Sequence, residues 1–316
     1  MTGSDVVVLY LGGMGRSGST LLDRLLGEVS GFCPVGELVF LWSRGLIDGE
    51  RCGCGEPFGD CAFWNRVGKE SFGGWDSIDA REMEALRHRV DRNRFIPWML
   101  APSAAPRAWR ESFTRYADVL GRLYHGVATA SNAAVVVDSS KHASTAALLR
   151  RTPGVDLRIA HLVRDPRGVA HSWSRVVERP DVVHGAGEMA RLGTGRVAAR
   201  WGSTNLLFEV LRMAERARPS LRLRYEDVVV DPSRQLSRLL ALAGEAEPEP
   251  LVVRGHQAEL GTQHTVSGNP LRFHAGPIEI RADDRWRSAM SRRDRWTVTA
   301  LTAPLWPLYG YRAARD

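Results

Sequence analysis

The N-terminal segment of the chain constrains its fold more strongly than any other part. Residues Val6–Leu11 are continuously apolar, a pattern typical of a parallel strand that is buried on both faces. A glycine-rich turn follows, and Ser19–Leu26 then carries paired leucines at helical spacing. A buried strand, a glycine turn and an amphipathic helix, in this order, are the phosphate-binding arrangement of α/β proteins. The segment therefore predicts an α/β fold with an anion site in its first loop.

Strands and helices alternate again in the second half of the chain. Apolar or alternating runs predict strands over Ala134–Asp138, Leu157–Val163 and Leu221–Tyr225. A helical segment is predicted after each strand, the first of them over His142–Arg151. Because such alternation is typical of parallel strands joined by crossover helices, we predict a P-loop-like parallel sheet with helices on both faces.

The residues from about 43 to 132 interrupt this alternation. They contain a cysteine-bearing loop, a charged helix predicted over Arg81–Arg94 and a longer helix over about Ala108–Ala130, without a strong strand signal. We interpret the whole chain, residues 1–316, as a single domain with a mainly helical insertion at about 43–132. We expect this insertion to lie over the C-terminal edge of the sheet.

Composition limits the classes of partner. The chain has 316 residues, 44% of them hydrophobic, and a formal net charge of +7 that suits anionic ligands. Its basic residues form no polybasic run, which argues against nucleic acid as a partner. We expect no transmembrane segment, because no apolar run reaches spanning length, and no leader, because Met1–Asp5 carries no positive side chain. These features favour a cytoplasmic protein, and they leave its oligomeric state open.

The first loop, Gly13–Thr20, matches the P-loop template at its glycines and at its last residue. Ser19 stands where that template has lysine, and the cation of the loop is Arg16. The sequence Gly-Arg-Ser-Gly-Ser-Thr-Leu-Leu at 15–22 resembles the 5′-phosphosulfate loop of sulfotransferases that use 3′-phosphoadenosine-5′-phosphosulfate (PAPS). The resemblance is to the branch with arginine in the loop, which includes the Golgi protein-tyrosine and carbohydrate enzymes and many bacterial relatives. It implies that Arg16 reaches the sulfuryl group and that the 5′-phosphate is held by Ser17, Gly18, Ser19 and Thr20.

A second motif lies at the end of the strand predicted over Leu157–Val163. Arg164 leaves this strand, and Ser172 follows eight residues later in the next helix. The planar guanidinium of arginine makes paired charge-assisted bonds with phosphate, although Arg164 and Asp165 could instead form a surface ion pair beside a helix cap. The same spacing of arginine and serine is similar to the 3′-phosphate motif of the family. The resemblance implies that Arg164 and Ser172 bind the 3′-phosphate.

Two residues are candidates for catalysis of sulfuryl transfer. Lys141, one of only two lysines in the chain, follows the strand Ala134–Asp138 at the edge where open sheets bind ligands. The resemblance implies that Lys141 assists the leaving oxygen, together with Arg16, and that Glu37 is the catalytic base. His142 is the alternative base, since neutral imidazole accepts protons near pH 7. Each of these residues is also compatible with an ordinary surface position.

Two later segments resemble further cofactor contacts of the family. Tyr225 stands in an Arg-Tyr-Glu-Asp segment whose tyrosine can approach the adenine, although an aromatic residue packed at a strand end is equally compatible. The segment His264–Phe273 has a Gly-Asn-Pro centre and is similar to the late loop that closes over PAPS. By this likeness, Ser267 and Arg272 are cofactor contacts.

Three of the four cysteines, Cys52, Cys54 and Cys61, are crowded into one segment. With Cys33 as a fourth ligand they would form a metal knuckle, but the single residue between Cys52 and Cys54 is tighter than structural zinc usually has. A disulfide within the segment is disfavoured in a reducing compartment. We therefore interpret these cysteines as free buried thiols and predict no metal.

The sequence as a whole favours a PAPS-dependent sulfotransferase. The expected reaction moves the sulfuryl group of PAPS to a hydroxyl of a small-molecule or glycolipid acceptor, releases PAP and requires no metal. The alternative is a P-loop nucleotide kinase that uses ATP and magnesium. Ser19 at the lysine position opposes this alternative, and Asp138 is its best magnesium candidate. A third reading is a binding module without catalysis, which would retain the loop and Arg164 but would not need Lys141 or Glu37.

Overall fold

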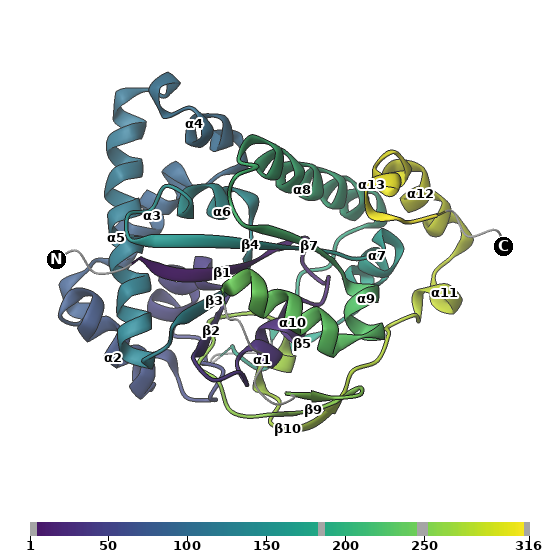
Figure 1. The fold of residues 1–316 in the computed structure, drawn as a ribbon, viewed down its shortest axis with the longest axis horizontal. Helices are drawn as coiled ribbons and strands as arrows, with labels where there is room; N and C mark the ends of the chain where they lie inside the picture. The colour runs from purple at the N-terminus through teal and green to yellow at the C-terminus, as the bar shows by residue number, and fades with distance from the viewer. Residues whose placement is uncertain (1–4, 183–186, 245–251, 313–316) are drawn as a thin grey trace.

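A computed structural model describes residues 5–182, 187–244 and 252–312 of the chain (Figure 1). A five-stranded sheet in the order β2-β3-β1-β4-β7 lies at its centre, and every pairing in this sheet is parallel. The predicted α/β fold is therefore confirmed. The strands are β1 (Val6–Gly13), β2 (Phe32–Gly36), β3 (Val135–Lys141), β4 (Val155–Val163) and β7 (Ser220–Arg224).

Helices cover both faces of this sheet. Figure 1 shows α6 and α8 above the strands and α1 and α10 below them. The described helices are α1 (Ser19–Leu26), α2 (Ala62–Phe72), α3 (Ala80–Val90), α4 (Ile96–Leu100), α5 (Arg107–Ser131), α6 (Ala143–Leu149), α7 (Pro166–Ser174), α8 (Thr194–Ala214), α9 (Tyr225–Val230), α10 (Pro232–Ala243), α11 (Trp286–Ala289), α12 (Arg292–Thr302) and α13 (Trp306–Tyr309).

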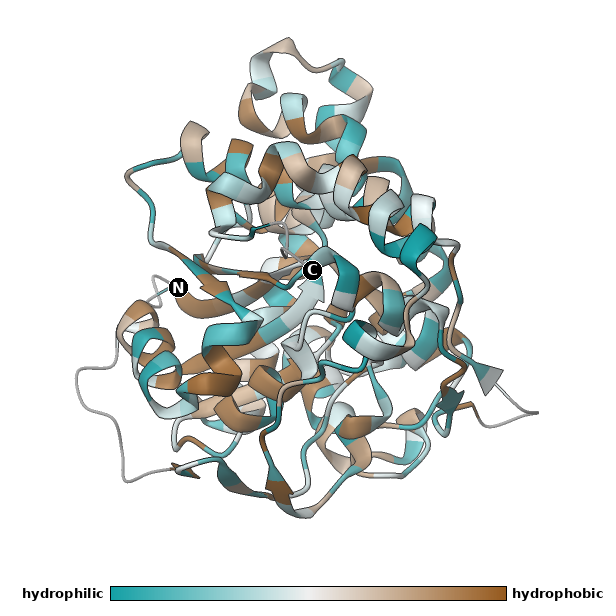
Figure 2. Cartoon of the chain, turned by 90° about the vertical axis from the view of Figure 1, so that its right-hand side faces the viewer, coloured by the Kyte–Doolittle hydropathy of each residue, from teal (hydrophilic) through white to brown (hydrophobic). Residues whose placement is uncertain are grey.

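The alternation of side chains along β1 builds a separate core on each face. Val8 and Tyr10 belong to a core that is completed by α5, α6 and part of α8. Leu9 and Leu11 point to the opposite face and join a core with α1 and α10. The surface helices in Figure 2 are mixed in hydropathy, as expected of helices that bury only one side. None of the helices in the described ranges is long and apolar enough to cross a membrane.

The segment between β2 and β3 holds α2, α3, α4 and α5. We expected it over the C-terminal edge of the sheet, but its long helix α5 packs against one face instead, because Leu120, Leu123 and Tyr124 join the core of Val8 and Tyr10. The segment reaches the C-terminal edge through the end of α3 and the turn that follows it. That part contributes Arg87, His88, Asp91, Arg92 and Asn93 to the cavity described below.

Strand β2 was not predicted from the sequence. Its five residues, Phe-Cys-Pro-Val-Gly, include Pro34, which cannot donate to a ladder, and Gly36, which has a φ of 73°. Within the five-stranded sheet β2 is an edge strand that pairs with β3. A β-bridge between Gly36 and Val266 covers its end. The short antiparallel sheet of β8 (Val253–Arg254), β9 (Gln257–Leu260) and β10 (Gly276–Glu279) was likewise not predicted.

Candidate active site

The C-terminal ends of the five parallel strands surround a cavity of about 1070 Å³. Each strand contributes a residue to its lining where the strand ends or the next segment begins. These residues are Arg16 after β1, Glu37 after β2, Lys141 at the end of β3, Arg164 after β4 and Tyr225 after β7. This is the edge at which open α/β sheets bind their ligands.

The loop between β1 and α1 needs its glycines. Gly13 has a φ of 134°, and a Cβ there would lie 2.2 Å from the carbonyl oxygen of Leu162. Gly18 has a φ of 96°, and its Cβ would lie 2.6 Å from the ring of Tyr225. Gly18 is also the N-cap residue of α1, and among the described residues no side chain caps this helix start. The first turn of α1 therefore keeps backbone N–H groups for an anion in the cavity.

Arg16 has the properties of an anion-binding group. In the described part of the chain, its Nε and Nη2 atoms are buried and have no hydrogen-bond partner, and the same holds for Oγ of Ser17. The guanidinium lies 5.7 Å from the ring centre of Trp173. Burial lowers the pKa of Arg16, Glu37 opposes this shift, and Arg175 adds to it. Because unpaired buried donors are costly, this geometry fits an anionic ligand.

Glu37 and Lys141 contact each other. Nζ of Lys141 donates to Oε1 of Glu37, and the two side chains are only 12% and 16% exposed. The backbone N–H of Glu37 donates to the carbonyl of Val266 at 2.7 Å, which holds the residue against the late loop. The structure therefore brings together the two residues that the sequence put forward for catalysis.

His142 lies beside this pair and also lines the cavity. Its ring meets that of Phe40 edge-on, with the centroids 6.0 Å apart. Desolvation of the ring lowers the pKa of His142, although the charges of Asp91 and Glu37 oppose this shift. This shift favours the neutral imidazole, which is the form that can accept a proton.

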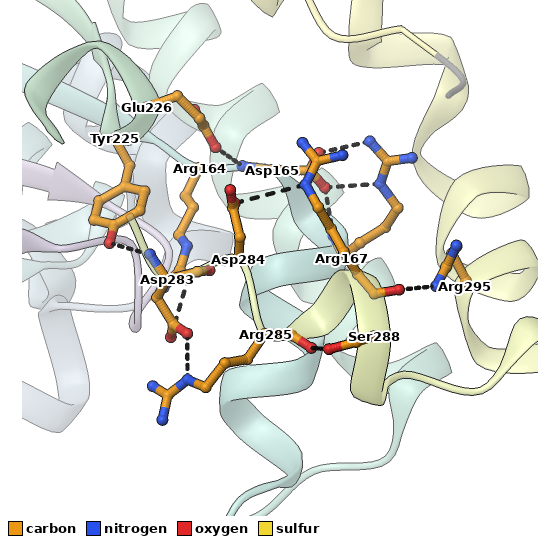
Figure 3. Close-up of polar contacts among 11 residues, drawn as sticks. Arg164, Asp165, Arg167, Tyr225, Glu226, Asp283, Asp284, Arg285, Ser288 and Arg295 are labelled. Atoms are coloured by element: carbon orange, nitrogen blue, oxygen red, sulfur yellow. Dashed lines mark hydrogen bonds and ion pairs between the residues drawn. The ribbon is translucent and has the colours of Figure 1, made fainter. Parts of the chain in front are cut away.

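Arg164 is held between neighbouring elements (Figure 3). Its Nη1 donates to the carbonyl of Arg16 at 3.1 Å, its Nη2 donates to the carbonyl of Asp283 at 2.9 Å, and its guanidinium lies 4.3 Å from the ring centre of Tyr225. Burial would raise the pKa of Asp283, but Arg285 and Arg164 lower it to about 2. Sequence reasoning missed Asp283, because no local pattern links it to a strand more than a hundred residues earlier.

The alternative ion pair between Arg164 and Asp165 is not formed. Asp165 caps α7 by accepting from the backbone N–H of Arg167, and its carboxylate pairs with the guanidinium of Arg167 at 2.6 Å (Figure 3). Arg164 instead faces the cavity, which Ser172 also lines from α7. Trp173, the next residue, was not singled out from the sequence, although its indole N–H donates to the carbonyl of Gly15 at 3.1 Å.

The two residues predicted in the late loop differ in position. Ser267 lines the cavity, and its Oγ accepts a hydrogen bond from Arg44 at 2.6 Å. Arg272 does not line the cavity: it is 1% exposed, and its guanidinium donates to the carbonyls of Thr265 and Arg51. The structure thus places Arg272 behind the loop, where it joins two chain segments.

The predicted residues of the loop between β1 and α1 also differ in whether they line the cavity. Gly18, Ser19 and Thr20 line the cavity, whereas the buried Ser17 does not. Asp138, the magnesium candidate of the kinase alternative, is fully buried, and it accepts hydrogen bonds from Tyr124 and Ser140. Its carboxylate is therefore occupied within the core and does not reach the cavity.

Comparisons with known proteins concern the family and the fold of the chain. Residues 9–249 match the Sulfotransferase family. No curated protein sequence gives a significant match. Among solved structures, the sulfotransferase domain from the curacin biosynthetic pathway is 18% identical, with a TM-score of 0.55 and coverage of 99% of both chains. The sulfotransferase domain from the olefin synthase of Synechococcus PCC 7002 is also 18% identical, with a TM-score of 0.48 and coverage of 99% of this chain and 98% of that one. Since the family match spans most of the chain, the protein belongs to the sulfotransferase family.

Proposed function

We propose that this sulfotransferase moves the sulfuryl group of PAPS to a hydroxyl of a small-molecule or glycolipid acceptor and releases PAP. The unpaired buried donors of Arg16, in the loop after β1, carry the proposal most directly. They lie beside a second arginine, Arg164, whose guanidinium contacts the backbone of Arg16. A nucleotide with phosphates at both its 5′ and 3′ positions suits this pair of cations from neighbouring strands.

The nucleotide would be held by groups from three strand ends and from the late loop. In this proposal, the cavity-lining loop residues Gly18, Ser19 and Thr20 hold the 5′-phosphate, and Arg164 and Ser172 hold the 3′-phosphate. Tyr225 supplies an aromatic face next to Arg164 for the adenine. Ser267 closes the cavity from the late loop, while Arg272 supports that loop from behind.

The ion pair of Glu37 and Lys141 would provide the catalytic base and the cation that stabilises the leaving oxygen. PAPS supplies a sulfuryl group that is bonded to a phosphate oxygen. Glu37 accepts the proton of the acceptor hydroxyl, which raises the nucleophilicity of the acceptor oxygen. Lys141 and Arg16 neutralise the negative charge that develops on the phosphate oxygen as the bond to sulfur breaks. The contact between Glu37 and Lys141 holds the two groups next to each other in the cavity. His142 is the second candidate for the base.

The acceptor would occupy the part of the cavity nearest α3. That wall carries Arg87, His88, Arg92 and Asn93 as well as the carboxyl group of Asp91, so it is a polar surface in which basic groups outnumber the acidic one. The wall favours an acceptor with polar or anionic groups near the hydroxyl that is sulfated.

Calorimetric titration with PAP tests the nucleotide assignment. We expect PAP to bind the wild-type chain, and Arg164→Ala to lose about 1.5–3 kcal/mol of binding free energy, as for a hydrogen bond to a charged group. Arg107→Ala, at an 87% exposed side chain, should bind PAP like the wild type. Transfer of labelled sulfate from PAPS to a panel of hydroxyl acceptors, with and without EDTA, then tests the reaction. Tight binding of ATP with magnesium in place of PAP, or no binding of PAP, would overturn the proposal.

A further inference from the structure

A second cluster of reactive side chains lies outside the cavity residues. Cys52, Cys54 and Cys61 come together with His264, and one ligand atom from each residue lies within 4.8 Å of all the others. Cys52 and Cys61 are 0% and 1% exposed, and the other two are half-buried. The cluster joins two segments that are far apart in the sequence, since His264 follows Cys61 by 203 positions. Cys33 lies in β2 and is not a member.

The spacing of the sulfur atoms indicates how they are used. Sγ of Cys61 lies 3.7 Å from Sγ of Cys52 and 3.8 Å from Sγ of Cys54. A disulfide requires about 2.05 Å, so none of these pairs is bonded. Two thiolates on one tetrahedral zinc ion, each about 2.3 Å from the metal, are about 3.8 Å apart. The observed separations therefore match the edges of a zinc tetrahedron.

The position of His264 fits the fourth corner of the same zinc tetrahedron. Nδ1 of His264 lies 3.3 Å from Sγ of Cys61 and 3.8 Å from Sγ of Cys52. With a zinc–nitrogen bond of about 2.0–2.1 Å, the tetrahedral edge between nitrogen and sulfur is about 3.5 Å, between these two values. The ring of Phe63 stacks on the imidazole, with centroids 5.0 Å apart and planes 15° apart, and fixes its orientation.

We propose that Cys52, Cys54, Cys61 and His264 bind one structural Zn²⁺ ion. Three thiolates and a neutral imidazole are a ligand set that zinc accepts, and four protein ligands leave no open position for a substrate. This proposal replaces the interpretation of the cysteines as free thiols, and it replaces Cys33 with His264 as the fourth ligand.

The short spacing between Cys52 and Cys54 is accommodated by the glycine between them. A Cβ at Gly53 would lie 2.4 Å from Oγ1 of Thr265, so only glycine lets the cysteine loop approach the segment of His264 this closely. The backbone N–H of Gly53 also donates to the carbonyl of Thr265 at 3.0 Å. The two segments are thus already aligned by backbone contacts at the residues next to the ligands.

The zinc ion would support one wall of the active site. Val266, two residues after His264, donates to the carbonyl of Val35 at 2.8 Å and accepts from Glu37 at 2.7 Å. Arg272 bridges the carbonyls of Arg51 and Thr265, each of which is next to a ligand. The metal and Arg272 would therefore both hold the late loop, which includes Ser267, against the end of β2. The site is structural and takes no part in sulfuryl transfer.

Metal analysis of the full chain, purified without chelators, is the direct test. We expect about one zinc ion per chain by inductively coupled plasma mass spectrometry. His264→Ala and Cys54→Ser should each lose most of this zinc. Cys33→Ser removes the cysteine that lies outside the cluster and should retain it, which makes it the matched control.

Measurements on the wild-type chain avoid the risk that a variant fails to fold. A mercurial that blocks thiols should release the zinc, and Co²⁺ taken up in its place should show the intense visible bands of tetrahedral thiolate coordination. Absence of bound zinc together with failure of the chain to take up Zn²⁺ or Co²⁺ would overturn the proposal, as would a disulfide in the non-reduced peptide map. None of these readouts uses PAPS or activity, so they are independent of the proposed reaction.

Discussion

Some individual residues in this protein adopt a left-handed backbone conformation that their residue type does not predict. Among the described residues, four other than glycine have a positive φ, and three of them, Arg16, Lys141 and Ser267, line the cavity. A non-glycine residue in this region costs of order 1–3 kcal/mol, so it persists only where its surroundings hold it. The strain is concentrated where the proposed function needs a side chain aimed into the cavity.

Lys141 allows a clean test at the residue scale, because the chain has only one other lysine. We expect Lys141→Ala to lower the turnover number for sulfate transfer by about 100-fold or more, as when one donor to a developing oxyanion is removed. PAP retains the phosphate oxygen that Lys141 would neutralise, so its affinity should also fall. The fall should be smaller than that of turnover, because Arg16 and the loop between β1 and α1 also hold this phosphate in the proposed site.

Lys69→Ala is the control for this variant. Lys69 lies exposed on α2 and does not line the cavity, so its removal should leave turnover unchanged. Equal turnover in Lys141→Ala and the wild type, measured with saturating PAPS, would remove Lys141 from the proposed mechanism.

At the scale of the element, the loop between β1 and α1 depends on Gly18. Gly18→Ala should destabilise the fold by more than about 1 kcal/mol, because alanine is strained at a φ of 96° and its Cβ meets the ring of Tyr225. That ring has little room to move, since its hydroxyl accepts a hydrogen bond from the backbone of Asp283. Urea unfolding measures the loss, and PAP affinity should fall with it.

Gly59→Ala provides the comparison. A Cβ at Gly59 would meet no heavy atom within 4 Å, and its φ is not in the left-handed region. We expect little change in stability there. A Gly18→Ala protein as stable as Gly59→Ala would show that the loop relaxes around the new methyl group.

Helix α1 also carries a buried carboxyl group. Burial raises the pKa of Asp23 to about 7, although Lys141 and Ser139 oppose the shift. An unfolded aspartate has a pKa of about 3.9, so between that pH and 7 the unfolded chain loses a proton that the folded chain keeps. The contribution of Asp23 to stability is therefore present at low pH and is lost as the pH rises to 7.

Asp23→Asn should remove this pH dependence. The stability of the variant relative to the wild type, from urea unfolding, should increase between pH 5 and pH 8. Asp48→Asn, at an exposed position, controls for the change of charge. A difference between Asp23→Asn and the wild type that stays constant with pH would contradict the assignment.

The elements differ in how readily the sequence reveals them. Strand β1 and helix α1 are evident because an apolar run and a helical leucine pattern are local properties. Strand β2 is hidden, because Pro34 and Gly36 oppose a strand and only tertiary contacts with β3 and Val266 stabilise it. The same distinction holds in the site, where Arg164 was found from a motif, whereas Asp283 and His264 depend on contacts between distant segments.

On the scale of the whole molecule, the parallel sheet explains how dispersed residues form one site. Parallel strands place all their C-terminal ends at one edge, so residues from positions 16 to 225 meet around the same cavity. The late loop reaches this edge by bridging to the end of β2. Motifs that follow predicted strands could therefore be expected at one edge of the sheet. The contributions of α3 and the late loop to the cavity walls could be seen only in the structure.

The charge of the molecule leads to a final prediction. Cationic side chains outnumber acidic ones around the cavity, which is lined by Arg16, Arg44, Arg87, Arg92, Lys141, Arg164, Arg175, Arg179, Arg200 and Arg285. Such a cavity concentrates anions, and salt screens this attraction. We expect the dissociation constant of PAP to rise several-fold when ionic strength increases from about 0.05 M to about 0.5 M. Adenosine, which has no phosphate, should bind weakly and with little dependence on salt. If PAP affinity were the same at both salt concentrations, the nucleotide would not be held chiefly by the phosphate contacts of Arg16 and Arg164.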